Sequence, residues 1–444
     1  MHRWVTVLML SVVVAAPASA QSLRSLVDQL FIFGSGEDQL FLAGTADPNN
    51  PASVQAHGAH FIPAAVEGNG ALISFLASAL GSSVANIPIS ATSSGQTFRF
   101  EGGVPVATST SPGPIFAERA QTLGRGRVLV GASVNRFRFS SVRGIPLNNV
   151  ELNFTHVNAD FEGCDAIFNG DCTLVGIPGL ENDFIELHLD LNMDVTANLF
   201  VLTYGLLDNV DIGVAVPVIT TNLRGTSTAQ VVPFGGTTAT HFFAGTADNA
   251  ELSATRFVEG SSTGLGDVAA RIKIRLSQGE NAGFAILADG RFPTGSTEDL
   301  LGSGETQIRG LGIVSARFGD FSPHANVGYL YRSGDAFADA VLATIGFDQR
   351  LSNWATLAVD VVSEFQAGEN PLTLPGEHRI DVPFRRTVTP TNIPDIRDDL
   401  INASVGFKFT AAPGLVVIAN TLWPLNKGGL RATAAWMAGL EYNF

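Results

Sequence analysis

The feature that most constrains this chain is a period of two in its hydrophobic pattern. In IELHLDLNMDV, residues 185–195, apolar side chains hold every odd position and polar ones every even position. Because successive side chains of a strand point to opposite faces, this segment predicts a strand with one apolar and one polar face. The same alternation recurs in residues 266–276, 323–332 and 402–409.

Alternating segments fill the chain from residue 126 onward, joined by short turns and long polar loops in turn. Short turns at one end and long loops at the other are typical of outer-membrane barrels, with periplasmic turns and extracellular loops. The predicted fold class is all-β: a transmembrane antiparallel β-barrel of about twelve strands, with fourteen as the alternative, over residues 126–444. The expected strands are 126–141, 183–206, 210–223, 265–277, 282–295, 306–318, 322–332, 337–348, 354–366, 397–409, 415–424 and 430–444, and the longest loops are 143–182, 224–263 and 367–396.

The composition supports a wall that contacts lipid. Charged residues make up 15% of the 444 residues and hydrophobic ones 45%, which is too few charges for the surface of a soluble protein of this size. The net charge of −15 disfavours nucleic acid as a partner, because phosphates would be repelled. We therefore expect outer-membrane lipid as the partner and the Gram-negative outer membrane as the location.

The N-terminal part differs from the barrel. The first twenty residues combine a short basic start, an apolar run and small residues before Gln21, which predicts a signal peptide, residues 1–20, cleaved near Ala20. Residues 21–125 hold helix-like runs at 22–33 and 68–83 among Gly- and Pro-rich stretches. We expect this segment to be a plug in the lumen, with a periplasmic segment as the alternative.

Two cysteines, Cys164 and Cys172, lie eight positions apart between turn-forming residues. In an oxidising compartment this spacing predicts a disulfide that closes a loop, with two free thiols as the alternative. No metal or cofactor is expected, because His57 and His60 are interpreted as two solvated loop histidines rather than as metal ligands.

Basic residues gather on the polar faces of neighbouring predicted strands. On the lipid face at mid-depth each would cost about 2–4 kcal/mol, so these side chains should point into the lumen and pair with carboxylates. They form either an ion-paired scaffold or a polar wall that steers the carboxylate or hydroxyl of an amphipathic ligand. The predicted lumen-lining residues are Arg271, Lys273, Arg275, Arg291, Arg309, Arg332, His188, His324, Asp360 and Glu364, with Asp190, Asp194 and Glu441 as further pairing partners.

No nucleophile motif accompanies His188 or His324, so no catalytic residue is predicted and the protein is not expected to be an enzyme. An outer-membrane hydrolase is the alternative if either histidine lies within hydrogen-bond reach of a serine.

The segment 183–206 changes parity along its length. Its apolar positions are odd up to Val195 and even after Leu199 and Phe200, which suggests a bulge. Without a bulge, Ile185 to Val195 would face the lumen as a hydrophobic track near the outer mouth.

The C-terminal AAWMAGLEYNF predicts a last strand that closes the barrel, because an open edge would leave backbone groups unpaired in hydrocarbon. Its lipid-facing residues are Trp436, Leu440, Tyr442 and Phe444, and a terminal Phe after alternating aromatics resembles the signal read by the barrel-insertion machinery.

Three segments carry a family resemblance. Residues 116–144, 204–218 and 422–444, above all PLNKGGLR at 424–431 with the terminal GLEYNF, resemble outer-membrane proteins associated with the meta-pathway of phenol degradation. That group is related to fatty-acid-transporter-type (FadL-like) barrels. The resemblance implies a transporter for passive uptake of small hydrophobic or aromatic compounds. A structural or adhesive surface barrel without transport is the alternative.

Overall fold

The computed structural model describes residues 21–34, 40–42, 68–77, 80, 98–101, 104–107, 113–154, 183–233, 242–246, 248–334, 337–369, 374–380 and 385–444. The predicted signal peptide, the predicted disulfide between Cys164 and Cys172, and His57 and His60 lie outside these residues.

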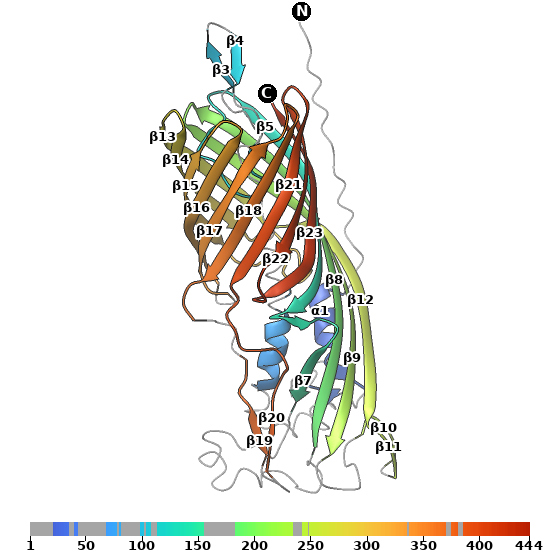
Figure 1. The fold of residues 1–444 in the computed structure, drawn as a ribbon. Helices are drawn as coiled ribbons and strands as arrows, with labels where there is room; N and C mark the ends of the chain where they lie inside the picture. Colours follow the sequence, from blue (N-terminus) through green and yellow to red (C-terminus); the bar gives the residue numbers. More distant parts are fainter. Residues whose placement is uncertain are drawn as a thin grey trace, which may run out of the picture.

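Twelve long antiparallel strands form a closed barrel (Figure 1). Each strand pairs with the next, and the last strand pairs with the first, so the barrel has no open edge. The prediction of an all-β barrel with twelve strands is therefore confirmed. The strands are β5 (Val128–Val142), β8 (Asp183–Leu207), β9 (Val210–Pro233), β13 (Val268–Gln278), β14 (Ala282–Phe292), β15 (Gln307–Ala316), β16 (Phe321–Arg332), β17 (Ala340–Arg350), β18 (Ala355–Gln366), β21 (Leu400–Ala412), β22 (Leu415–Pro424) and β23 (Leu430–Asn443).

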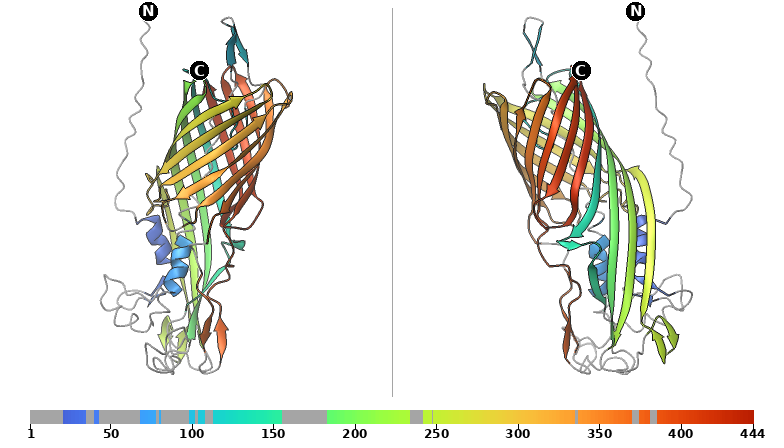
Figure 2. Two further views of the ribbon diagram at one scale, coloured as in Figure 1. Left: turned by 90° about the vertical axis from the view of Figure 1, so that its left-hand side faces the viewer. Right: turned by 45° about the vertical axis from the view of Figure 1, so that its right-hand side comes forward.

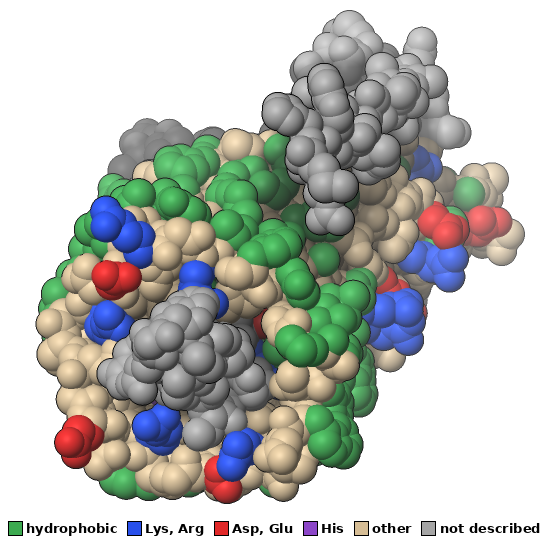
Figure 3. Space-filling model, turned by 90° about the horizontal axis from the view of Figure 1, so that it is seen from above, with side chains coloured by type: hydrophobic (Ala, Val, Ile, Leu, Met, Phe, Trp, Pro, Cys, Tyr) green, Lys and Arg blue, Asp and Glu red, His purple; other side chains and the backbone are tan. Residues whose placement is uncertain are grey.

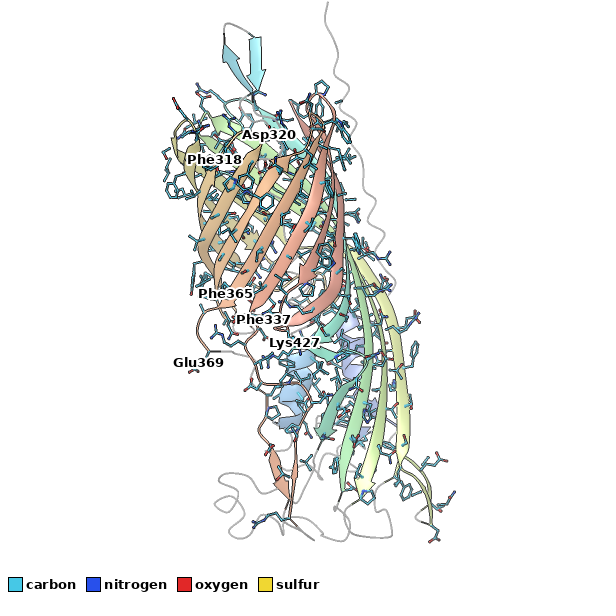
Figure 4. All side chains as sticks on the ribbon, viewed as in Figure 1. Phe318, Asp320, Phe337, Phe365, Glu369 and Lys427 are labelled. Atoms are coloured by element: carbon cyan, nitrogen blue, oxygen red, sulfur yellow. The ribbon has the colours of Figure 1, made fainter. Side chains whose placement is uncertain are left out.

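The two ends of the barrel differ. The short turns and the C-terminus lie together at the top of Figure 1, and we call this the turn end. Phe318 and Asp320 mark it in Figure 4, whereas Phe365, Glu369 and Lys427 mark the opposite end, which we call the loop end. The backbone amide of Phe444 donates to the Val128 carbonyl at 2.9 Å, which ties the last residue to the first barrel strand.

The outer wall of the barrel is apolar. Large hydrophobic side chains are exposed on it, among them Phe200, Val327, Ile345 and Trp436, each more than half exposed. Viewed onto the turn end, hydrophobic side chains surround the barrel and charged ones gather near the rim (Figure 3). The exposed set includes the predicted lipid-facing residues Trp436, Leu440, Tyr442 and Phe444.

Beyond the loop end, four strands continue as a curved sheet, which we call the extension (Figures 1 and 2). β9 pairs with β13 near the turn end, but from Val218 to Gln230 it pairs with β12 (Ser253–Leu265). That stretch is about 40 Å long at ~3.3 Å per residue. The other members are the distal part of β8 and its partner β7 (Val150–Phe154).

The extension corrects the predicted loop 224–263, much of which is strand. Outside a bilayer the outer face of a sheet no longer has to be apolar. Here it carries polar residues such as Thr220 and Thr263, whose hydroxyl oxygens lie 2.9 Å apart. Because the outer face of such a strand is polar, the sequence lacks a lipid-facing apolar set of residues, and the segment was therefore predicted as a polar loop.

Two short helices pack on the inner face of the extension, α1 (Leu23–Gln29) and a helix at 68–77 (Figure 2). Both helix-like runs were predicted, and in the second one Leu72, Phe75, Leu76 and Leu80 are buried. The approach of α1 is close, because a Cβ on Gly260 would lie 2.4 Å from Leu26 Cδ1. The helices and the sheet share one hydrophobic core.

The predicted bulge near Leu199 was wrong. β8 and β9 pair in one register from Asp183 to Gly205, with a shift only between Gly205 and Leu207. Odd residues of β8 therefore face inward from Asp183 to Gly205. The parity of the apolar residues changes because the outer face of the strand changes character: even residues on the barrel wall, such as Phe200, are apolar, and even residues in the extension, such as His188, are polar.

Short elements complete the chain. The hairpin β3 (Phe98–Glu101) and β4 (Val104–Ala107) projects from the turn end (Figure 1). Among the described residues, no helix is long and apolar enough to cross a membrane. The remaining strands are β1 (Ile32–Phe33), β2 (Leu40–Phe41), β6 (Ile145–Pro146), β10 (Ala244–Thr246), β11 (Asn249–Glu251), β19 (His378–Ile380) and β20 (Arg386–Val388).

Candidate functional site: the lumen and the segment that crosses it

Residues 113–123 run through the lumen immediately before the first barrel strand. Most of these residues are buried, with exposed fractions of 0% for Ile115, 5% for Arg119 and 3% for Leu123. The contacts of this segment reach strands on several sides of the barrel, so it obstructs the lumen toward the turn end. We call it the luminal segment.

Two adjacent charged residues hold the luminal segment from opposite sides. Glu118 accepts from Lys273 Nζ of β13 at 3.0 Å, and its other carboxylate oxygen lies 3.5 Å from Arg271. Arg119 points to β17, where its Nε donates to Asp348 at 3.0 Å and a second nitrogen contacts the other carboxylate oxygen. Successive residues of an extended chain point in opposite directions, so one Glu-Arg pair can bridge two walls.

The backbone of the luminal segment is also held by the wall. Asn326 of β16 accepts from the Glu118 amide at 2.8 Å and donates to the Glu118 carbonyl at 2.9 Å. Ser315 accepts from the Ala120 amide at 3.0 Å, and the Asp211 carboxylate accepts from the Leu123 amide. These bonds satisfy backbone groups of an extended chain that has no neighbouring strand of its own.

Apolar contacts supplement the polar ones. Ile115 packs in a cluster with Val416, Ile418 and Met437 of β22 and β23. Ala120 packs with Leu287 and with residues of β15 on another side of the barrel. The luminal segment therefore has a defined position rather than filling a water-lined channel loosely.

The structure brings most of the predicted lumen-lining residues to the inner face. Arg309 and Arg271 flank Asp289, and Arg332 pairs with Glu364 at 2.5 Å near the loop end. The inward-facing members of the predicted set are Arg271, Lys273, Arg291, Arg309, Arg332, His324, Asp360 and Glu364.

Other members of the predicted set lie elsewhere. His188 was predicted to line the lumen, which is wrong: its side chain is 47% exposed on the outer face of the extension, next to Glu186. Asp190 and Asp194 share that face, and Asp194 pairs with Arg138 at 2.9 Å. The physical reason is the unbroken register of β8, which turns all its even residues outward. Arg275 lies at the turn-end rim, where it donates to the Asp208 carbonyl at 2.9 Å.

A buried acid and histidine group lies beside the luminal segment. His324 Nε2 is 2.7 Å from Asp360, and its Nδ1 is 3.9 Å from Asp348. Within the described residues, neither His324 nor His188 hydrogen-bonds to a serine. No group of three or more His, Cys, Asp or Glu there could hold a metal ion.

The residues that bind the luminal segment were not predicted from the sequence. Glu118 and Arg119 lie in a stretch without alternation, and Asp348 and Asp211 occur near strand ends next to turn residues. The signal that could have found them is the pair of adjacent opposite charges in FAERAQ, in a region otherwise short of charge.

An apolar stripe leads from the extension into the barrel. It consists of the odd residues of β8 from Ile185 to Val201, all buried. In the extension these residues belong to the core shared with the helices, and further in, Leu199 and Val201 pack against Ala215 and Ala269. The members of the stripe are Ile185, Leu187, Leu189, Leu191, Met193, Val195, Ala197, Leu199 and Val201.

A closed antiparallel barrel with an apolar outer wall and a polar, filled lumen defines an integral β-barrel protein of the outer membrane. Lipid contact over the outer wall follows from that class. Neither a protein-family model nor a curated protein sequence matches the chain. The resemblance to the phenol-pathway group therefore stays a prediction.

Several solved barrels are similar in fold. An outer membrane channel from Pseudomonas putida F1 aligns over 73% of this chain and 98% of its own, with 11% identity and a TM-score of 0.40. The TodX monoaromatic hydrocarbon channel, as a deltaS2 mutant, aligns over 73% and 92%, with 10% identity and a TM-score of 0.33. A Pseudomonas aeruginosa FadL homologue aligns over 72% and 90%, with 10% identity and a TM-score of 0.29. This likeness concerns the barrel fold and nothing finer.

Proposed function

We propose that this protein is an outer-membrane channel for passive uptake of small hydrophobic or aromatic compounds. The observation that carries the proposal is the apolar stripe of β8. A channel for polar solutes needs a wetted wall, whereas here the inward face of one strand is apolar from Ile185 to Val201. Such a face binds apolar molecules in proportion to the area removed from water.

The luminal segment acts as a plug in this proposal, and the turn end faces the periplasm. The extension then stands on the outer side, where an apolar compound adsorbs beside the helices and follows the stripe inward. The compound leaves through the barrel wall or through the turn end after the luminal segment has moved out of its position. The proposal also includes removal of the signal peptide and recognition of the C-terminal strand by the barrel-insertion machinery.

The test is uptake of radiolabelled toluene by cells that carry or lack the protein. The informative variant is Val201→Thr, which adds one hydroxyl to the stripe at nearly constant volume. An unpaired hydroxyl in an apolar site costs about 1–2 kcal/mol, so uptake should fall roughly 5- to 30-fold. The matched control is Val130→Thr on the outer wall, where Val130 is 43% exposed.

Equal toluene uptake with and without the protein would refute the channel. The same result would favour a structural or adhesive surface barrel, and one observation supports that alternative: the luminal segment obstructs the lumen in the described conformation. The hydrolase alternative requires a histidine within hydrogen-bond reach of a serine, and among the described residues His324 bonds to Asp360 and His188 to Glu186.

A further inference from the structure

Arg271 is a buried charged group whose hydrogen-bonding capacity is poorly satisfied by the described residues of the lumen. Its side chain is 3% exposed, yet none of its three guanidinium nitrogens makes a hydrogen bond to a described residue. Its two carboxylate neighbours are distant for such a group, with Glu118 at 3.5 Å and Asp289 at 3.7 Å. A buried guanidinium normally forms several short charge-assisted hydrogen bonds. An anion that forms such bonds to Arg271 would therefore bind it more favourably than Glu118 and Asp289 do.

A second unsatisfied donor lies beside it. The Thr203 hydroxyl is buried and has no hydrogen-bond partner within the described part of the chain. Thr203 and Arg271 are the cross-strand neighbours of Gly213 on its two sides. A Cβ on Gly213 would lie 3.2 Å from the Thr203 hydroxyl oxygen and 3.3 Å from Arg271 Cγ, so both side chains pack closely against this glycine.

The apolar stripe ends at the same place. Val201, Ala215 and Ala269 form one cross-strand row on the inner face. The next row toward the turn end on that face is Thr203, Gly213 and Arg271. An amphipathic molecule that follows the stripe would therefore meet a guanidinium and a hydroxyl where the apolar surface stops.

We propose that Arg271 and Thr203 form a binding site for the carboxylate of an amphipathic ligand, and that Glu118 fills this site while the luminal segment is in place. The inference rests on the proposed channel function and specifies its ligand class as apolar acids. Glu118 holds Arg271 loosely, so a ligand carboxylate that binds the guanidinium bidentately replaces it. Because Glu118 belongs to the luminal segment, this exchange removes one of the bonds that keep the segment in the lumen.

The experiment measures binding of benzoate and of its neutral analogue benzamide to the purified full-length protein in detergent by calorimetry. Arg271→Gln should weaken benzoate binding about tenfold or more, and Thr203→Val severalfold, while benzamide binding stays unchanged. Glu118→Gln should strengthen benzoate binding, because it removes the competing carboxylate. The matched control is Arg275→Gln on the same strand at the rim, which should bind benzoate as the unmodified protein does.

Unchanged benzoate affinity in a folded Arg271→Gln protein would overturn the site. If that variant fails to fold, the nearly isosteric Thr203→Val decides, and unchanged affinity in it has the same meaning. Failure of the channel is recognised separately. Toluene uptake with Arg271-independent benzoate binding rejects the site and keeps the channel, whereas Arg271-dependent binding without toluene uptake keeps the site and rejects the channel.

Discussion

The ion pair between Arg119 and Asp348 offers a direct test of whether the luminal segment closes the barrel. Asp348 is fully buried and Arg119 is 6% exposed at its side chain, so the pair lies in a low-dielectric site. Breaking a buried pair by removal of one partner costs about 3–5 kcal/mol, because the other charge stays buried. The cost of Asp348→Asn should lie at the lower end of this range, about 3 kcal/mol, because the amide oxygen of asparagine still accepts one hydrogen bond from Arg119.

The penalty should act on the luminal segment and not on the barrel. β17 stays paired with β16 and β18 along its length, and this backbone pairing does not depend on the Asp348 side chain. Arg119 can reach water only if the segment leaves its position. About 3 kcal/mol then corresponds to a roughly 100-fold rise in the population with an open lumen.

The assay is the ion conductance of the purified protein in planar bilayers. The matched control is Asp320→Asn, the same substitution in a pair with Arg350 that is 2.8 Å long and partly exposed at the turn end. Exposed pairs contribute about 0–1 kcal/mol, so this control should conduct like the unmodified protein. Equal conductance of the two variants would refute the conclusion that the Arg119–Asp348 pair holds the segment.

Two further predictions test the outer wall and the helix packing. Val327→Arg, in the middle of the lipid-facing side of β16, should lower the free energy of unfolding in vesicles by about 2–4 kcal/mol, as measured by urea titration. The control Thr228→Arg, on the outer face of the extension, should change this free energy by less than about 0.5 kcal/mol. Similar losses in the two variants would place the extension in lipid. Gly260→Val should overpack the contact with α1 at a cost of about 1–3 kcal/mol, which should speed amide hydrogen exchange in α1 by about 5- to 150-fold. The control Gly310→Val, where a Cβ has open space around it, should leave the exchange in α1 unchanged. Unaltered exchange in both variants would show that the packing of α1 tolerates the added side chain.

The barrel could be predicted from the sequence because lipid acts on each strand separately. A strand such as β16 needs apolar side chains at every second position toward the bilayer and polar side chains toward the lumen. Both patterns are visible within its twelve residues. The inward position of His324 and Arg332 follows from that local rule alone. The two N-terminal helices could also be predicted from local patterns, because the apolar residues of 68–80 recur at helical spacing.

The extension shows where the local rule changes. β8 keeps its inward odd face throughout, but its outer face is apolar at Phe200 and polar at His188. From the sequence alone, a change of surrounding solvent and a bulge produce the same change of parity. The pairing with β9 decides between them, and it is this pairing that moves His188 out of the lumen.

The sequence by itself determined that strands alternate, that they close into a barrel, and that basic residues on their polar faces avoid lipid. Only the tertiary structure decided which charges meet: Glu118 with Lys273, Arg119 with Asp348, and Arg271 with Glu118 and Asp289 at longer distances. The alternation is imposed by the bilayer and the lumen on every strand independently. The pairing of two residues more than 150 positions apart depends instead on how the whole barrel brings its walls together around one segment.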